Sequence, residues 1–308
     1  MSIRKQGKRV ACRNKKGELT MCMRFGLELE TLVPQQTQFD LPKHRDISDR
    51  QTGWIRTSDP SLQPSSGENG AEFVSGVYEF NTSAISWLYE STKAMKASGA
   101  RVNRSCGFHL STSTFTMTPQ KFYNFVKMAK RYQQVFIGVG ACPHRENGRW
   151  ATPWRGDATQ VDPDSISESD ISDDLLEKYR WLNLRSLDYS GRNIPSNNRM
   201  ELRSPTGTLN ADKITAITNL WCSFYQWTQC DKLHFIENMD CNSKGIGSKK
   251  LDELLENIGY TNRGRRNRHF NFHVPHAKQS LSDTVDILRE QLSKYDIRRQ
   301  GENNKKEF

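Results

Sequence analysis

Hydrophobic and polar residues alternate along the chain with two different periods, which predicts both helices and strands. Ile85, Leu88 and Met95 recur at helical spacing behind a Thr82-Ser83 cap, so they predict one face of an amphipathic helix. Short apolar-rich runs bounded by polar residues predict strands instead. The predicted strands cover residues 21–32, 71–80, 102–113, 179–187 and 199–203, and the predicted helices cover residues 84–98, 119–136, 214–227, 251–258 and 281–292.

The order of these elements indicates the fold class. The chain runs through strands and helices in turn and ends in helices, without the Gly-rich turns of a repeated βαβ unit. We therefore predict an α+β protein with a mainly antiparallel sheet.

Composition narrows the class of protein without selecting a function. Of 308 residues, 45 are Lys or Arg and 35 are Asp or Glu, which gives a net charge of +10. No apolar run reaches the roughly 18 residues that span a bilayer, and no apolar stretch follows the basic N-terminus as in a signal peptide. The 7 cysteines include no CxxC pair and are too sparse for a disulfide scaffold. We expect a cytoplasmic protein without membrane contact.

Two basic segments support nucleic-acid binding as an alternative function. The first 24 residues contain eight Lys or Arg against one Glu, a net of +7. In residues 261–273, four arginines precede Phe270 and Phe272, a mixture that suits single strands because arginines bind phosphates and rings stack on bases. The other interpretation of both segments is a solvated basic surface.

The sharpest candidate for chemistry is the run FGLELE. Glu28 and Glu30 are two positions apart, so on a strand both side chains point to one face. Neighbouring carboxylates repel each other unless a cation lies between them, and oxygen ligands suit Mg²⁺ or Mn²⁺. The alternative is the exposed polar face of an antiparallel sheet.

Three further strands contribute charged or histidine side chains. Glu72 lies in GAEFVSG, His109 in SCGFHLS, and Glu201 and Arg203 in RMELRSPTGTLN. If these strands converge, they form a carboxylate and histidine metal site with an arginine for phosphate charge. Alternatively, His109 is a core histidine bonded to a carbonyl, and the Glu-x-Arg pair belongs to a cross-strand ladder of ion pairs.

These motifs together resemble the amidoligase family of phages, plasmids and microbial genomes. The resemblance rests on FGLELET, WIRTSDPSL, GAEFVSG, VNRSCGFHLS, KYRWLNL and RMELRSPTGTLN in this order, and it covers roughly residues 21–230. It implies a carboxylate–amine ligase with a glutamine synthetase-like fold, in which a curved antiparallel sheet holds ATP and divalent ions. The chain then divides into a basic arm (1–20), a catalytic domain (21–235) and a helical, basic C-terminal extension (236–308).

The resemblance also implies roles for individual residues. Arg203 would contact the transferred phosphate and His109 would bind metal beside it, while Asn183 would contact substrate or nucleotide. The loosest match is Glu79, as a further acid. The implied ligands of Mg²⁺ or Mn²⁺ are Glu28, Glu30, Glu72, His109 and Glu201.

The chain departs from the family pattern at two positions. Ser111 replaces the second histidine of an HxH pair, and Gly76 replaces a proline. A catalytically inert relative is therefore a second alternative, although the acids and the arginine favour an active enzyme. The implied partners are a carboxylate and an amine, each a small molecule, peptide or protein, in the host cytoplasm if the gene is a phage gene. The acidic stretch 157–177 could form a lid, attract an ammonium group, or be a solvated spacer.

Overall fold

The structure is a computed structural model of the 308-residue chain. It describes residues 12–13, 19–20, 23–42, 53–113, 119–140, 151–154, 177–184, 199–229, 247–260 and 280–306.

An antiparallel sheet organises the described part of the chain. Its strand order is β4-β5-β3-β7-β9-β8, and the short strand β6 pairs with β3 beside the end of β5. A separate two-stranded ribbon joins β1 and β2. The strands are β1 (Cys12–Arg13), β2 (Leu19–Thr20), β3 (Arg24–Pro34), β4 (Trp54–Ser58), β5 (Glu68–Ser75), β6 (Tyr78–Glu79), β7 (Phe108–Ser113), β8 (Leu182–Asn183) and β9 (Arg199–Leu202).

The central strand β3 shows why the sheet has two different faces. Its odd-numbered residues, including Phe25, Leu27 and Leu29, are buried in the core, and the even-numbered residues from Arg24 to Glu30 are only half-buried. This period of two follows from the pleat of a strand. We call the face to which Glu28 and Glu30 point the acidic face.

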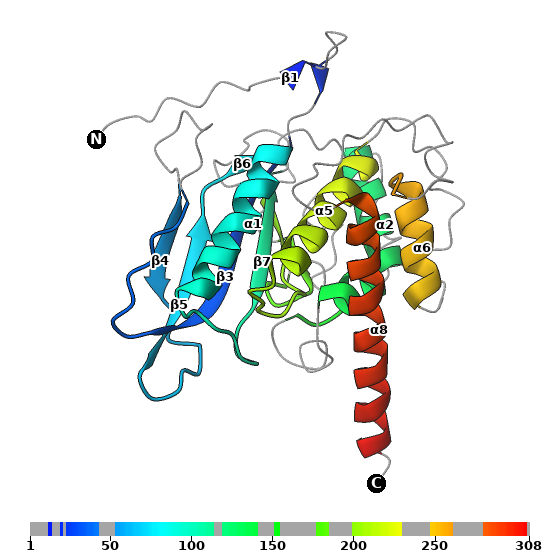
Figure 1. Ribbon diagram of the computed structural model, residues 1–308. Helices are drawn as coiled ribbons and strands as arrows, with labels where there is room; N and C mark the ends of the chain where they lie inside the picture. The colour runs from blue at the N-terminus through cyan, green and yellow to red at the C-terminus, as the bar shows by residue number, and fades with distance from the viewer. Residues whose placement is uncertain are drawn as a thin grey trace.

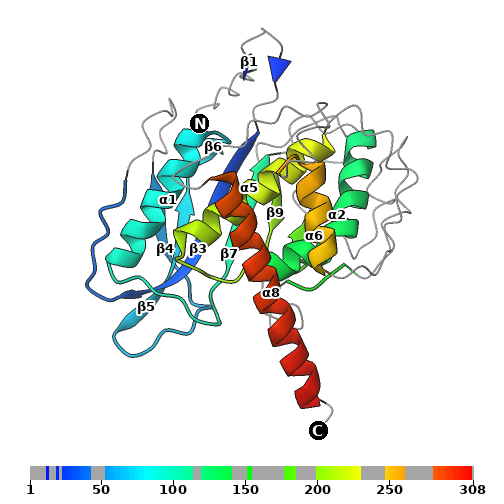
Figure 2. The same ribbon diagram turned by 45° about the vertical axis from the view of Figure 1, so that its right-hand side comes forward.

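Helices cover the opposite face of the sheet. Figures 1 and 2 show α1 and α5 lying across the sheet, with α2 and α8 packed beside α5 and α6 packed against α2 and α8. None of the helices in the described segments combines the length and apolar character that crossing a bilayer requires. The helices are α1 (Thr82–Ala97), α2 (Pro119–Gly140), α5 (Ala211–Thr228), α6 (Gly247–Asn257) and α8 (Leu281–Lys306).

Aromatic side chains join α5 to the sheet and to α2. The Trp221 ring packs edge-on against Phe125 and Phe136 of α2, and its Nε1 donates a hydrogen bond of 2.8 Å to Thr112 Oγ1 on β7. All four residues are buried. The core therefore reaches β7 from the helical side, directly behind the acidic face.

The predicted α+β class and antiparallel sheet are confirmed, with differences in detail. The strand expected at 71–80 divides into β5 and β6, and β7 begins at Phe108 rather than at residue 102. Strand β4 was not predicted, because its residues are mostly exposed at the sheet edge and show no alternation of apolar and polar types. In the expected C-terminal extension, helix α8 packs on α2 and α5, and helix α6 packs on α2 and α8.

Helix α1 begins at Thr82, and its cap lies one residue before the predicted Thr82-Ser83 cap. Asn81 has an extended backbone, and its side chain accepts a hydrogen bond of 2.9 Å from the Ala84 N–H, so Asn81 caps the helix in place of Thr82. Replacing Asn81 by Ala is expected to lower the free energy of unfolding by about 1 kcal/mol. Urea denaturation checks this value, and Asn81→Asp, which keeps the acceptor, should unfold close to the wild type.

Candidate functional site

Strand register places the predicted acids side by side on the acidic face. Glu30 lies directly opposite Glu72 on β5, and Glu28 lies opposite His109 on β7. Because directly opposed residues of antiparallel strands share a face, the side chains of these four residues meet. The predicted convergence of separate strands is thus present in the structure.

The first group of possible ligands is Glu28, His109 and Glu201. His109 Nδ1 lies 3.4 Å from Glu28 Oε2 and 3.4 Å from Glu201 Oε1. One ligand atom from each residue falls within 4.8 Å of the others. His109 and Glu201 are only 4% and 6% exposed, so a cation here would be held largely away from water.

The second group is Glu30, Glu72 and His109, on the other side of the same imidazole ring. One ligand atom from each of these residues also lies within 4.8 Å of the others. His109 Nε2 is buried, lies 3.8 Å from Glu30 Oε1 and has no hydrogen-bond partner among the described residues. The second oxygen of Glu30 accepts a hydrogen bond of 2.5 Å from the Gly107 N–H. His109 therefore separates two clusters of carboxylates.

Glu201 is the centre of a buried polar network. Arg203 Nη1 donates to Glu201 Oε1 at 2.7 Å, and Asn183 Nδ2 donates to Glu201 Oε2 at 2.9 Å. All three side chains are buried. Each donor fixes one carboxylate oxygen, so the network holds Glu201 in one orientation toward His109.

The uncharged residues Thr206 and Gly207, which follow β9, set the position of Gly107. Gly107 forms an isolated bridge with Thr206, and the Gly207 N–H donates to the Cys106 carbonyl at 2.9 Å. A Cβ at Gly207 would lie 2.5 Å from the Cys106 Cβ, so only glycine allows this approach. The segment after β9 thereby supports the N–H that binds Glu30.

The two clusters differ in their electrostatics. A hydrogen bond with His109 holds the pKa of Glu28 below its usual value, and the charges of Arg199 and Arg203 act in the same direction. Burial raises the pKa of Glu72, and the nearby charges of Glu28 and Glu30 raise it further. At Glu72, burial and the neighbouring carboxylates therefore outweigh the opposing effect of His109.

The raised pKa of Glu72 predicts a pH-dependent metal affinity. Protons compete with a cation for this carboxylate, so Mg²⁺ affinity should fall as the pH is lowered from neutral toward the raised pKa of Glu72. Calorimetric titration with Mg²⁺ across this range measures the effect. Glu72→Gln should bind Mg²⁺ more weakly and with a flatter pH profile, and an unchanged profile in this variant would contradict the assignment.

The donor set fits a hard divalent cation. Four carboxylates and one imidazole supply mostly oxygen ligands, which suit Mg²⁺ or Mn²⁺ better than softer metals. The buried His109 Nε2 without a described partner and the raised pKa of Glu72 both indicate a place where a cation would be stabilised.

Other residues named from the sequence also lie on the acidic face. Ser111 is opposite Gly26 and Glu201 in register, and Glu79 is opposite Arg24 at the far end of β3. Sequence reasoning gave no role to Gly107 or to Arg199. A signal for Arg199 was present, since it precedes Glu201 by two positions and therefore shares its face.

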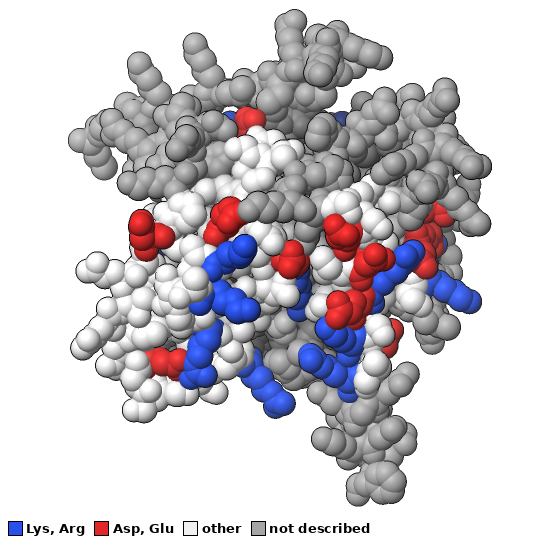
Figure 3. All heavy atoms as spheres, viewed as in Figure 1, with Lys and Arg blue, Asp and Glu red and all other residues white. Residues whose placement is uncertain are grey.

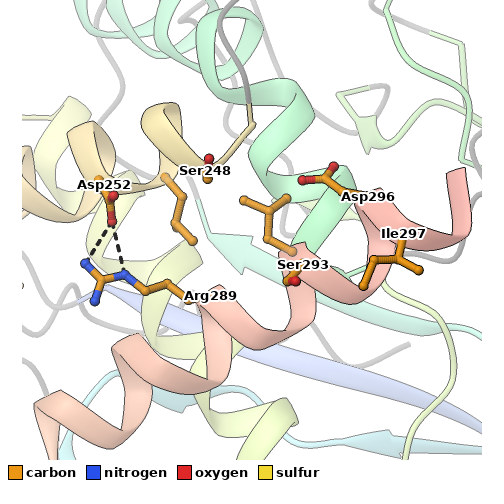
Figure 4. Close-up of a pocket in the computed structure, with 8 residues that line it drawn as sticks. Ser248, Asp252, Arg289, Ser293, Asp296 and Ile297 are labelled. Carbon is orange, nitrogen blue, oxygen red and sulfur yellow. Dashed lines mark hydrogen bonds and ion pairs between the residues drawn. The ribbon is translucent and has the colours of Figure 1, made fainter. Parts of the chain in front are cut away.

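Two cavities lie outside the acid clusters. One of about 360 Å³ lies between α6 and α8 and is lined by the half-exposed pair Asp252 and Arg289 (Figure 4), an arrangement typical of a surface ion pair. The other, of about 700 Å³, is lined by β4 and the turn that follows it. Its residue Thr57 lies opposite Glu72, so this cavity begins one strand away from the acids.

The described residues on the helical side show no large area of one charge. Figure 3 shows lysines and arginines mixed with aspartates and glutamates over α1 and α8. The basic segments 1–24 and 261–273 and the acidic stretch 157–177 lie wholly or mostly outside the described residues. Nucleic-acid binding and a lid function therefore stay predictions.

Comparisons with known proteins identify a family. The family described as “Putative amidoligase enzyme” matches residues 35–227, well over half of the chain. The matched region includes Glu72, His109, Asn183, Glu201 and Arg203, while Glu28 and Glu30 precede it. No curated protein matches the sequence at a significant level.

Two solved structures show limited similarity. A bifunctional glutathione synthetase from Pasteurella multocida has 13% identity and a TM-score of 0.43, with 89% of this chain and 47% of that one covered. The chain thus spans about half the length of that protein. Plasmodium falciparum glutamine synthetase has 10% identity and a TM-score of 0.37, with coverages of 93% and 73%. Scores this low support no inference about this chain.

Proposed function

The chain belongs to the amidoligase family, and on this premise we propose that it is an ATP-dependent carboxylate–amine ligase. The observation that carries the proposal is the pair of carboxylate clusters on either side of His109. Amide formation from a free carboxylate requires activation, and a nucleotide triphosphate with divalent cations supplies it. A sheet face with paired cation sites and a buried arginine suits that task.

Each cluster would hold one divalent cation. Glu28 and Glu201 would bind one ion, and Glu30 and Glu72 would bind the other, with His109 within reach of both. A neutral imidazole offers one lone pair, so His109 would ligate only one of the two ions. A divalent cation held by these residues would supply positive charge against the negative charge that develops during phosphoryl transfer.

Arg203 is the residue placed to stabilise the transferred phosphoryl group. Its guanidinium is buried and already oriented by the 2.7 Å bond to Glu201. A fixed planar donor beside the clusters stabilises equatorial phosphate oxygens without reorganisation. Asn183 acts through Glu201, because its amide fixes the second carboxylate oxygen.

The proposed reaction has two steps. A substrate carboxylate oxygen attacks the γ-phosphorus of ATP, the bond to the β–γ bridging oxygen breaks, and ADP leaves. The neutral amine then attacks the acyl carbon, the carbon–oxygen bond to phosphate breaks, and the nitrogen loses a proton. The products are an amide, ADP and phosphate.

Release of ADP tests the proposal. Full-length protein incubated with ATP, Mg²⁺ and pools of amino acids or polyamines is expected to form ADP only when a carboxylate and an amine are both present. Glu28→Gln should reduce ADP formation about a hundredfold or more, because it removes a charged ligand of the first cluster. The proposal fails if Glu28→Gln and the wild type release ADP equally, or if chelation of Mg²⁺ has no effect.

A further inference from the structure

Two exposed apolar side chains lie close to the carboxylate clusters. Among the described residues, three large apolar side chains are more than half exposed: Ile55 at 52%, Val77 at 58% and Ile297 at 67%. Ile297 lies on α8, whereas Ile55 lies on β4 and Val77 lies between β5 and β6. A single exposed apolar side chain is ordinary, but a group of them bordered by polar residues indicates a binding surface.

Strand register places Ile55 on the acidic face. Ile55 lies opposite Val74 on β5, and Val74 lies opposite Glu28 on β3. Because directly opposed residues share a face, Ile55 and the half-buried Val74 continue the row of Glu28 toward the edge of the sheet. Two strand spacings separate Ile55 from Glu28, roughly 10 Å, a distance that a chain of several carbon atoms spans.

A β-bulge turns Val77 toward the same face. The register of β6 on β3 differs by one residue from that of β5 on β3, so the three residues 75–77 face only two residues of β3. An extra residue of this kind reverses the alternation of side chains along a strand. Tyr78 therefore points into the core, where it is 1% exposed, and Val77 before it points to the acidic face. We call Ile55, Val74 and Val77 the apolar patch.

Ser75 ties the bulge to β3. Its hydroxyl accepts a hydrogen bond of 2.8 Å from the Leu27 N–H and donates one of 2.7 Å to the Gly76 carbonyl. A Cβ on Gly26 would lie 3.3 Å from the same carbonyl oxygen, so the two strands also approach closely here. The direction of Val77 is thus set by the backbone on both sides of it.

The apolar patch borders carboxylates of both clusters. Glu72 precedes Val74 by two positions on β5 and shares its face, and Glu28 lies opposite Val74 on β3. Arg203 lies beyond these acids, because it follows β9 on the other side of β3 and β7. A phosphate group is attracted to the arginine, and a protonated amine is attracted to carboxylates. The amine is therefore expected on the side of the patch.

We propose that the apolar patch is a subsite for a hydrocarbon chain on the amine substrate. The inference rests on the proposed function, which places the reacting centre at the carboxylate clusters. The patch adjoins that centre, so a chain attached to the amine would cover Ile55 and Val77 and remove apolar surface from water. The substrate class is a primary amine with an apolar chain, rather than ammonia or a polyamine.

Binding of simple alkylamines tests the subsite. Calorimetric titration of the Mg²⁺-loaded full chain, without nucleotide, is expected to show that hexylamine binds at least about tenfold more tightly than butylamine. Each buried methylene group contributes a factor of about four, and hexylamine has two more of them. Equal affinities for the two amines in the wild type would overturn the inference.

Substitutions to threonine locate the binding surface. Ile55→Thr and Val77→Thr keep the branched shape that suits a strand and replace apolar atoms by a hydroxyl. Each should weaken hexylamine binding about fourfold and leave butylamine nearly unchanged, while Ile55→Val should retain most of the preference. Ile297→Thr is the matched control, because it removes an equally exposed apolar side chain on α8, and it should change neither affinity.

The remaining outcomes separate the subsite from other ligands and from the ligase. An unchanged hexylamine preference in both threonine variants would overturn the inference. So would a loss of ADP affinity in these variants, since the patch would then bind the nucleotide base, or a chain-length preference for hexanoate over butanoate without one for the amines. A hexylamine preference without any ADP formation would support the subsite and contradict the ligase.

Discussion

Glu201→Gln is expected to lower ADP formation about a thousandfold while the protein stays folded. The amide keeps an acceptor for one donor, but it removes the charge that orients Arg203 and faces His109 Nδ1. Loss of one preorganised electrostatic group at a transferring centre typically costs a factor of about 10²–10³, and loss of a metal ligand adds to it. Single-turnover ADP release at saturating Mg²⁺ measures the effect.

Glu253→Gln is the matched control for Glu201→Gln. Glu253 is also a carboxylate that accepts bonds from an arginine and a second side chain, here Arg131 and the Tyr132 hydroxyl between α2 and α6. The substitution should reduce stability and leave ADP release per folded molecule unchanged. If both variants lost activity equally, the effect of Glu201→Gln would be attributable to folding rather than to the site.

Trp221→Ala is expected to lower the free energy of unfolding by about 4 kcal/mol. Truncation of a fully buried tryptophan leaves a cavity, and the known range for such changes is about 3–5 kcal/mol. It also leaves the Thr112 hydroxyl without the donor that lies 2.8 Å away. Urea denaturation of the variant and the wild type measures the difference.

Thr112→Val separates the hydrogen bond from the packing. The valine has nearly the same shape and lacks the acceptor, so it should cost about 1 kcal/mol, well below the cost of Trp221→Ala. A loss as large as that of Trp221→Ala would show that the hydrogen bond, and not the aromatic packing, dominates at this position.

The sequence predicted that Glu28 and Glu30 share a face of the sheet because a strand has a fixed period. Alternation in FGLELE was enough to place Glu28 and Glu30 on one face, and the buried odd positions of β3 agree with it. Antiparallel pairing then brought Glu72 and His109 beside them. No signal within one strand states which residue of another strand lies opposite, so register could not be predicted.

Residues outside regular alternation were harder to predict. The edge strand β4 packs against only one neighbour, so its residues need not alternate. Asn81 caps α1 although Thr82 and Ser83 are equally suitable residue types, since the choice depends on where the backbone turns. The contribution of Gly107 is a backbone N–H, which no residue type specifies.

Gly207 influences the position of the Glu30 carboxylate indirectly, through its close approach to Cys106. Any side chain there would push residues 206–208 away from Cys106, and the Gly107 N–H would move out of line with Glu30. A substitution to alanine would thus alter the affinity of the second cluster without touching a charged atom. The preference of the second cluster for one cation over another thus depends in part on how closely the backbone at Gly207 can approach the backbone at Cys106.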